Sequence, residues 1–279
     1  MKRFIKGNAG CIGWLFLYVG IEVGVAIGLF AAYLTYSVNF KMDFLEIFSW
    51  LATEKTLSDL EYSLNMMESL VKLSDEIILP VIGISGVIIC SLLVISSRKS
   101  DKKIIKKLNR QQIGRYMVIG SWLNLVITIV LYMIPERFME TYNSSVGMVL
   151  TGNYLLVVLV AGIIGPITEE VLFRYFQFNS CKAIGLRYAI LATALSFGAM
   201  HGNWIQGGYA FVLGLVFAIV NNREDNLLPS IIIHITINLS SVLISRNWSN
   251  EIAGLVAYLC IFYAGYLLIQ RKEKLVEAI

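Results

Sequence analysis

The sequence predicts an all-α fold, a polytopic membrane helical bundle of about eight transmembrane helices with an amphipathic external helix. Composition is the first reason: 57% of the 279 residues are hydrophobic and only 15% are charged, and the mean hydropathy is +0.70. The second is that the apolar residues gather in long segments, and the third is that basic residues concentrate in alternate connections. A soluble globular protein has a much more polar composition.

Eight apolar segments approach the roughly 20 residues that are needed to cross a bilayer. They cover approximately residues 11–36, 77–97, 116–134, 149–173, 187–204, 206–222, 227–245 and 252–270. The first is too long for the core of a signal peptide, so we expect the mature protein to retain it. The four cysteines form no CxxC pair and predict no disulfide framework or zinc–thiolate site.

The distribution of Lys and Arg predicts how the chain crosses the membrane. With a cytoplasmic N-terminus, the cytoplasmic segments hold 18 of the 23 basic residues, and eight of these fall between Arg98 and Arg115. This distribution satisfies the positive-inside rule. We therefore expect both termini to be cytoplasmic and the protein to lie in the plasma membrane of a prokaryote.

Two polar connections lie in the N-terminal half. The external connection, 37–76, contains a capping box followed by apolar residues at helical spacing, which predicts an amphipathic helix over 58–73 that packs on the bundle or acts as a lid. The basic loop, 98–115, should attract anionic lipid at about 1 kcal/mol per residue. It has no interleaved aromatic residues, so we expect no nucleic-acid partner.

Three charged residues end the fourth apolar segment: Glu169, Glu170 and Arg174. A charge near the centre of a bilayer costs at least a few kcal/mol, so these groups need compensation unless they are ordinary flanking charges in the headgroup region. Glu170 and Arg174 are four residues apart and can pair on one face of a helix. Glu169 points about a hundred degrees away. We therefore expect a chemical role for Glu169 and a structural one for Glu170.

The only two histidines of the chain also lie in apolar segments. His201 falls near the end of the fifth segment, and His234 lies in the seventh, four residues before Asn238 and on the same helix face. A single intramembrane histidine commonly makes an interhelical hydrogen bond. Here, however, the histidines and the glutamate pair occupy three segments of the same half of the chain, which indicates a site.

These residue types suit hydrolysis of an amide without a covalent intermediate. Glu169 with His201 could hold and deprotonate a water, and His234 with Asn238 could donate hydrogen bonds to the oxyanion that forms. Zinc is the alternative, since Glu169, His201 and His234 together resemble a catalytic ligand set. No HExxH motif accompanies them, so we expect no metal or other cofactor.

Three motifs carry a resemblance to a known family: Glu-Glu-x-x-x-Arg at 169–174, Phe-x-x-x-His at 197–201 and His-x-x-x-Asn at 234–238. In this order on successive hydrophobic segments, they resemble the CPBP or Abi family. That family includes the Ras-converting CAAX endopeptidases and bacterial relatives linked to bacteriocin processing and self-immunity. The resemblance covers residues of about 149–245.

The resemblance implies an eight-helix glutamic intramembrane endopeptidase acting on a membrane-associated peptide or protein. It makes Glu169 and His201 the water-activating pair and His234 with Asn238 the oxyanion stabilisers. It gives supporting roles to the other matched positions, Glu170, Arg174 and Phe197. We accordingly divide one structural domain into an N-terminal membrane region, 1–148, a catalytic core of four spans, 149–245, and a final span with a cytoplasmic tail, 246–279.

Two matters stay open at the level of sequence. A non-enzymatic immunity protein, or a small transporter that binds a proton or peptide, would also carry intramembrane charges, and Glu22 in the first segment is a further such charge with a structural or functional role. The predicted spans also put Glu169 near the inner end of one helix and His201 near the outer end of the next. A bend near Pro166 or a deeper start of the fifth span would bring them together.

Overall fold

The computed structural model confirms the all-α prediction. It describes residues 2–40, 78–97, 104–246 and 251–270, and every regular element in these ranges is a helix. In chain order the elements are α1 (Lys2–Phe40), α4 (Leu79–Ser97), α5 (Arg110–Met133), η2 (Glu136–Phe138), α6 (Glu140–Leu150), α7 (Tyr154–Leu159), η3 (Val160–Ile164), α8 (Gly165–Glu170), η4 (Val171–Gln177), α9 (Phe178–Lys182), α10 (Leu186–Ala199), α11 (Trp204–Glu224), α12 (Leu228–Arg246) and α13 (Glu251–Gln270). The helix expected over 58–73 lies outside the described residues.

The apolar helices correspond to the eight predicted segments. Five stretches are long and apolar enough to cross a membrane: 7–29, 79–97, 110–133, 154–182 and 204–224. Three shorter apolar helices cover 186–199, 228–244 and 254–270. The chain is therefore a polytopic helical bundle and an integral membrane protein.

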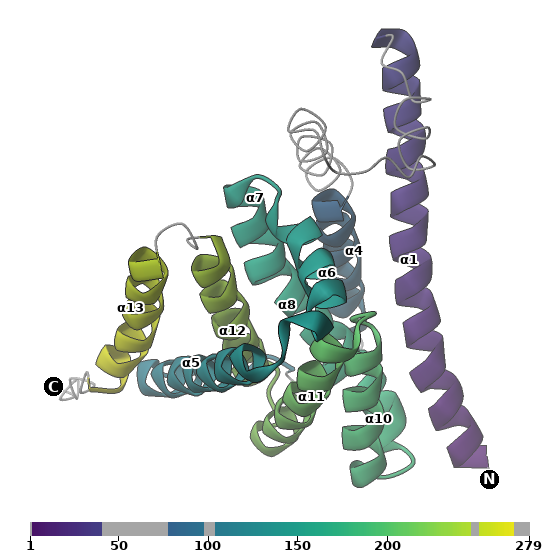
Figure 1. Cartoon of the computed structure of the whole chain (residues 1–279). Coiled ribbons are helices and arrows are strands. Elements are labelled where there is room, and N and C mark those ends of the chain that lie inside the picture. Colours follow the sequence, from purple (N-terminus) through teal and green to yellow (C-terminus); the bar gives the residue numbers. More distant parts are fainter. Residues whose placement is uncertain (1, 41–77, 98–103, 247–250, 271–279) are drawn as a thin grey trace, which may run out of the picture.

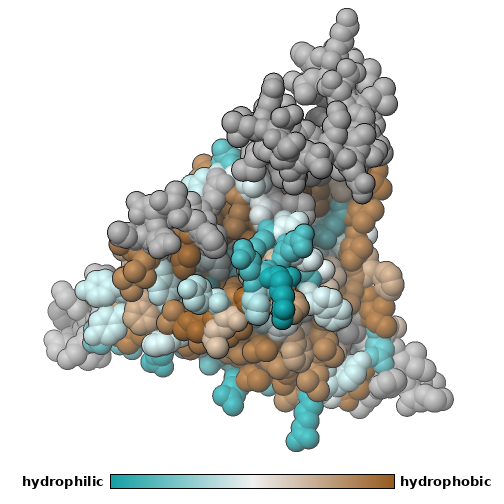
Figure 2. All heavy atoms as spheres, in the orientation of Figure 1, coloured by the Kyte–Doolittle hydropathy of each residue, from teal (hydrophilic) through white to brown (hydrophobic). Residues whose placement is uncertain are grey.

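The helices pack in a few close groups (Figure 1). The crossing helix α5 contacts both α12 and α13, and α10 contacts α11. The long helix α1 runs along one side of the bundle and contacts α4, η4 and α9. Figure 2 shows apolar side chains along the outer surface of α1, as expected of a helix that faces lipid.

The fourth span differs from the predicted segment 149–173, because the helical path begins at Tyr154 and continues to Lys182. Within it, the short helix α8 lies between two π-helical stretches, η3 and η4. The prediction ended the span at Arg174 because a charge normally marks a membrane boundary. Here Arg174 is buried inside the protein, so the helix continues past it.

The corrected span accounts for the heights of the two candidate catalytic residues. Glu169 precedes the turn at Ala183 by 14 residues, and His201 follows Gly185 by 16 residues. At 1.5 Å per residue both lie about 21 to 24 Å from this turn, on antiparallel arms of one hairpin. The hairpin therefore brings them to the same level without a sharp bend at Pro166.

Glycines close the hairpin around His201. An added Cβ at Gly198 would lie 2.6 Å from the carbonyl oxygen of Gly207, so α10 and α11 are in near backbone contact. Gly202 has a φ of +70°, a left-handed conformation that favours glycine. His201 is thus placed in the tight turn between these helices.

Candidate active site

The candidate residues come from three stretches of the C-terminal half. Glu169 and Glu170 end α8, and Arg174 follows in η4. Phe197 lies on α10, and His201 lies in the turn after it. His234 and Asn238 lie one turn apart on α12, which packs against α8 and η3.

Glu170 and Arg174 form a buried ion pair. Nε of Arg174 lies 3.3 Å from Oε2 of Glu170, and both side chains are 0% exposed. The guanidinium carbon also lies 4.8 Å from the ring centre of Phe197 and 5.4 Å from that of Phe217, within the range of cation–π attraction. The pairing expected from their spacing is present, and neither charge is left uncompensated.

His234 joins the two glutamates. Its Nδ1 lies 3.1 Å from Oε1 of Glu170, and its Nε2 lies 3.7 Å from Oε2 of Glu169. The imidazole is buried and stacks on Phe217 with ring centres 4.9 Å apart. Because the carboxylate of Glu170 is an acceptor, Nδ1 carries a proton, and Nε2 is the nitrogen that faces Glu169.

The two adjacent glutamates differ in their surroundings. Glu170 is enclosed by Arg174 and His234, and the hydroxyl of Ser230 lies against it. The side chain of Glu169, by contrast, is 28% exposed and contacts only one edge of the imidazole. Glu169 is therefore the carboxylate that a small molecule can reach.

His201 is held in a defined tautomer by its own helix. Its Nδ1 lies 2.8 Å from the carbonyl oxygen of Phe197. Because a carbonyl only accepts, Nδ1 carries the proton and Nε2 is left as an acceptor. The Phe197 ring meets the imidazoles of His201 and His234 at centre distances of 5.0 and 5.6 Å, both edge to face.

Phe197 thus lies between the two histidines. Within the part of the chain that the structure describes, Glu169 makes its contact with His234, and no direct contact joins it to His201. The water-activating role of Glu169 with His201 stays a prediction.

Asn238 connects the site to the π-helical stretch η3. Its Nδ2 donates to the carbonyl oxygen of Ala161 over 3.0 Å. A π-helix shifts the backbone pairing and is common near functional sites. The amide keeps one further N–H for another acceptor. Its predicted role toward an oxyanion would use that second hydrogen.

The sequence contained a signal for one contact that the motif analysis missed. Ser230, His234 and Asn238 recur every four residues and line one face of α12 toward the glutamates. Phe217, which stacks on His234, had no comparable signal, because aromatic residues are frequent throughout the chain.

The alternative zinc ligands do not gather into a metal site here. Across residues 2–40, 78–97, 104–246 and 251–270, no group of three or more His, Cys, Asp or Glu side chains is placed to hold a metal ion. Glu169 and His234 are neighbours, but His201 is held by the Phe197 carbonyl instead.

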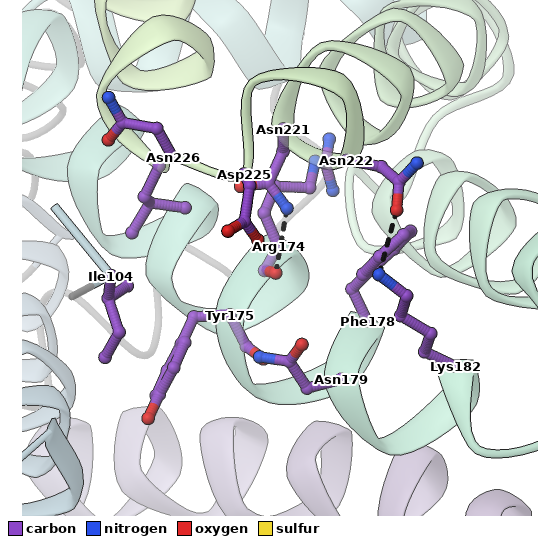
Figure 3. Close-up of a pocket in the computed structure, with 11 residues that line it drawn as sticks. Ile104, Arg174, Tyr175, Phe178, Asn179, Lys182, Asn221, Asn222, Asp225 and Asn226 are labelled. Atoms are coloured by element: carbon purple, nitrogen blue, oxygen red, sulfur yellow. Dashed lines mark hydrogen bonds between the residues drawn. The ribbon is translucent and has the colours of Figure 1, made fainter. Parts of the chain in front are cut away.

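Two cavities flank the candidate site. One, of about 370 Å³, is an apolar groove between α4 and the α7–η3 stretch, with Gly83 and Val160 in its walls. The other, of about 280 Å³, lies on the side of Arg174 away from the glutamates and is lined by asparagines (Figure 3). There Asn221 donates to the Arg174 carbonyl and Lys182 donates to Asn222, so these polar groups serve the fold.

Comparison with known proteins points to one family. Residues 151–240 match the family model of the type II CAAX prenyl endopeptidases of the Rce1-like group. The matched range contains all three motifs and all the candidate residues described above. The searches of curated proteins and of solved structures returned no match.

Proposed function

The segment 151–240 belongs to the Rce1-like type II CAAX prenyl endopeptidase family, and from this premise we propose that the protein is a glutamic intramembrane endopeptidase. It hydrolyses a peptide bond of a membrane-associated protein or peptide. The family supports a membrane protease. The substrate class we propose is a CAAX-type protein, a bacteriocin or a signal peptide.

One observation carries the mechanism: of two adjacent carboxylates, Glu170 is fully enclosed and Glu169 is accessible. Glu169 takes a proton from a water, whose oxygen attacks the carbonyl carbon of the substrate. The acceptor Nε2 of His201 helps to hold that water. As the C–N bond breaks, Glu169 passes its proton to the leaving amine.

The oxyanion of the intermediate needs donors. Asn238 offers its second amide hydrogen, and His234 offers Nε2–H in its charged form. Glu170 accepts from Nδ1 of the same ring and compensates the positive charge. Arg174 in turn holds Glu170 in place. In this proposal the reaction uses no metal.

The test is cleavage by the purified protein in liposomes. A library of hydrophobic and lipidated peptides is incubated with wild type, Glu169→Gln and the matched control Glu136→Gln, which makes the same change at an exposed position. Mass spectrometry detects new termini. We expect wild type and the control to cleave, with or without a zinc chelator, and Glu169→Gln to lose at least a hundredfold in rate, on the order expected for a general base.

Each other result has a definite meaning. Cleavage that disappears on chelation and returns with added metal would replace the glutamic mechanism by a metallopeptidase. If folded wild type produces no new termini from the library, the immunity or transport alternative gains support.

The orientation and surroundings of the protein are also proposed. The distribution of basic residues supports cytoplasmic termini in a prokaryotic plasma membrane, with anionic lipid at 98–115.

A further inference from the structure

Helix α1 docks against the catalytic hairpin in a regular antiparallel register. An added Cβ at Gly10 would lie 3.0 Å from Cβ of Ser180. One turn further along α1, Trp14 stacks on Phe176 with ring centres 4.0 Å apart. Each four-residue step up α1 therefore matches a four-residue step back along the fourth span.

The next steps of this register lead to the active site. Tyr18 is buried in the same core cluster as Leu172 and Phe173. One further turn puts Glu22 at the level of Glu169. In agreement, Glu22 is close enough to Glu169 for the two carboxylates to repel each other.

Glu22 has no basic partner among the described residues that would explain it as a structural charge. Their ion pairs do not include it, and its one polar neighbour is the hydroxyl of Tyr18, which donates to it. Glu22 is half-buried on the face of α1 that meets the hairpin. An intramembrane carboxylate that faces the protein interior commonly serves a function.

We propose that Glu22 is a third acidic residue of the active site, which accepts the second O–H of the water that Glu169 deprotonates. The inference rests on the proposed function. A water has two O–H bonds: one proton passes to Glu169, and the other stays on the oxygen and is directed at Glu22. Held at both hydrogens, the oxygen turns a lone pair toward the substrate carbonyl. Tyr18 fixes the Glu22 carboxylate from the other side.

Kinetics of purified variants test this role. Glu22→Leu should lower kcat by about tenfold to a hundredfold, the scale of a misplaced reactant, with KM within about twofold because the substrate contacts are unchanged. Glu22→Gln should retain more activity than Glu22→Leu, since its carbonyl oxygen still accepts a hydrogen bond. The packing control is Trp14→Leu, which removes the stack on Phe176 and leaves Glu22 in place.

Two results would overturn the inference while leaving the proposed function intact. One is a wild-type kcat in Glu22→Leu. The other is an equal loss in Glu22→Leu and Trp14→Leu, which would make the role one of packing. If wild type itself cleaves no peptide, the inference and the proposed function both fail.

A measurement without activity checks the geometry. In a variant without the four native cysteines, Glu22→Cys and Glu169→Cys should be joined by a short bifunctional maleimide, whereas Val23→Cys, on the exposed face of α1, should not be joined to Glu169→Cys. Equal yields at positions 22 and 23, or no yield at 22, would contradict the register.

Discussion

Glu170 accepts a hydrogen bond from Nδ1 of His234 over 3.1 Å, and this contact decides which nitrogen of the ring faces Glu169. The same carboxylate holds Arg174 through its other oxygen. A chain of contacts therefore runs from a buried guanidinium, through a buried carboxylate and an imidazole, to the accessible carboxylate. Changes at its two ends should have different consequences.

The two adjacent glutamates should separate activity from stability. Glu169→Gln should abolish cleavage and leave the apparent unfolding temperature close to wild type, because the Glu169 side chain is partly exposed and lies outside the buried pair. Glu170→Gln should lower the unfolding temperature, because it leaves Arg174 buried without a counter-charge. Thermal unfolding in detergent and peptide cleavage, measured on the same preparations, check both. Equal destabilisation by the two variants would contradict the division of roles.

The Glu170–Arg174 pair should be strongly coupled. Either Glu170→Gln or Arg174→Met alone should cost about 3 to 5 kcal/mol of stability, because each leaves one buried charge without its partner. The double variant should cost clearly less than the two single changes together, since no unpaired charge then remains. Unfolding of the four proteins by denaturant gives the coupling free energy. Additive single effects would show that the pair is not a unit.

The contact between α10 and α11 should be intolerant of a single methyl group. Gly198→Ala places Cβ 2.6 Å from the Gly207 carbonyl oxygen, so the helices must separate, at a cost of about 1 to 3 kcal/mol. Because His201 follows directly in the turn, cleavage should also decrease. The control is Gly208→Ala, whose Cβ meets nothing within 4 Å; it should keep activity and stability. A stable, active Gly198→Ala protein would refute the close packing.

Asn238 should act through its amide hydrogens. Asn238→Asp keeps the shape of the side chain but replaces the donor to the Ala161 carbonyl by a second acceptor. We expect a loss of about 1 to 3 kcal/mol of stability, as for an unsatisfied buried polar group, together with a large loss of cleavage. Denaturant unfolding and peptide assays measure the two effects. Unchanged stability would mean that the Ala161 contact contributes little.

Much of the architecture was predictable because bilayer thickness imposes a simple length rule on apolar segments. The segment of 187–204, for example, corresponds to α10 and the turn that holds His201. The end of the fourth span was not predictable, because the rule takes any charge as a boundary. Only the packing of Arg174 against Glu170 and the ring of Phe197 lets the helix continue through it.

The candidate residues were found by type and spacing, whereas their mutual contacts were not. Spacing gives the partner within one helix, as for Glu170 and Arg174, but contacts between helices depend on rotation and depth. The contacts of His234 with both glutamates are of that second kind. The approach of Glu22 to Glu169 also depends on how a distant helix docks.

The turn at 183–185 serves as the origin of a ruler for this protein. Glu169 and His201 meet because the two arms that leave this turn have nearly equal lengths. Inserting one residue into either arm would move its catalytic group by about 1.5 Å and rotate it by about 100°. Variation in length among natural relatives should therefore fall outside 169–201, or appear as compensating changes in both arms.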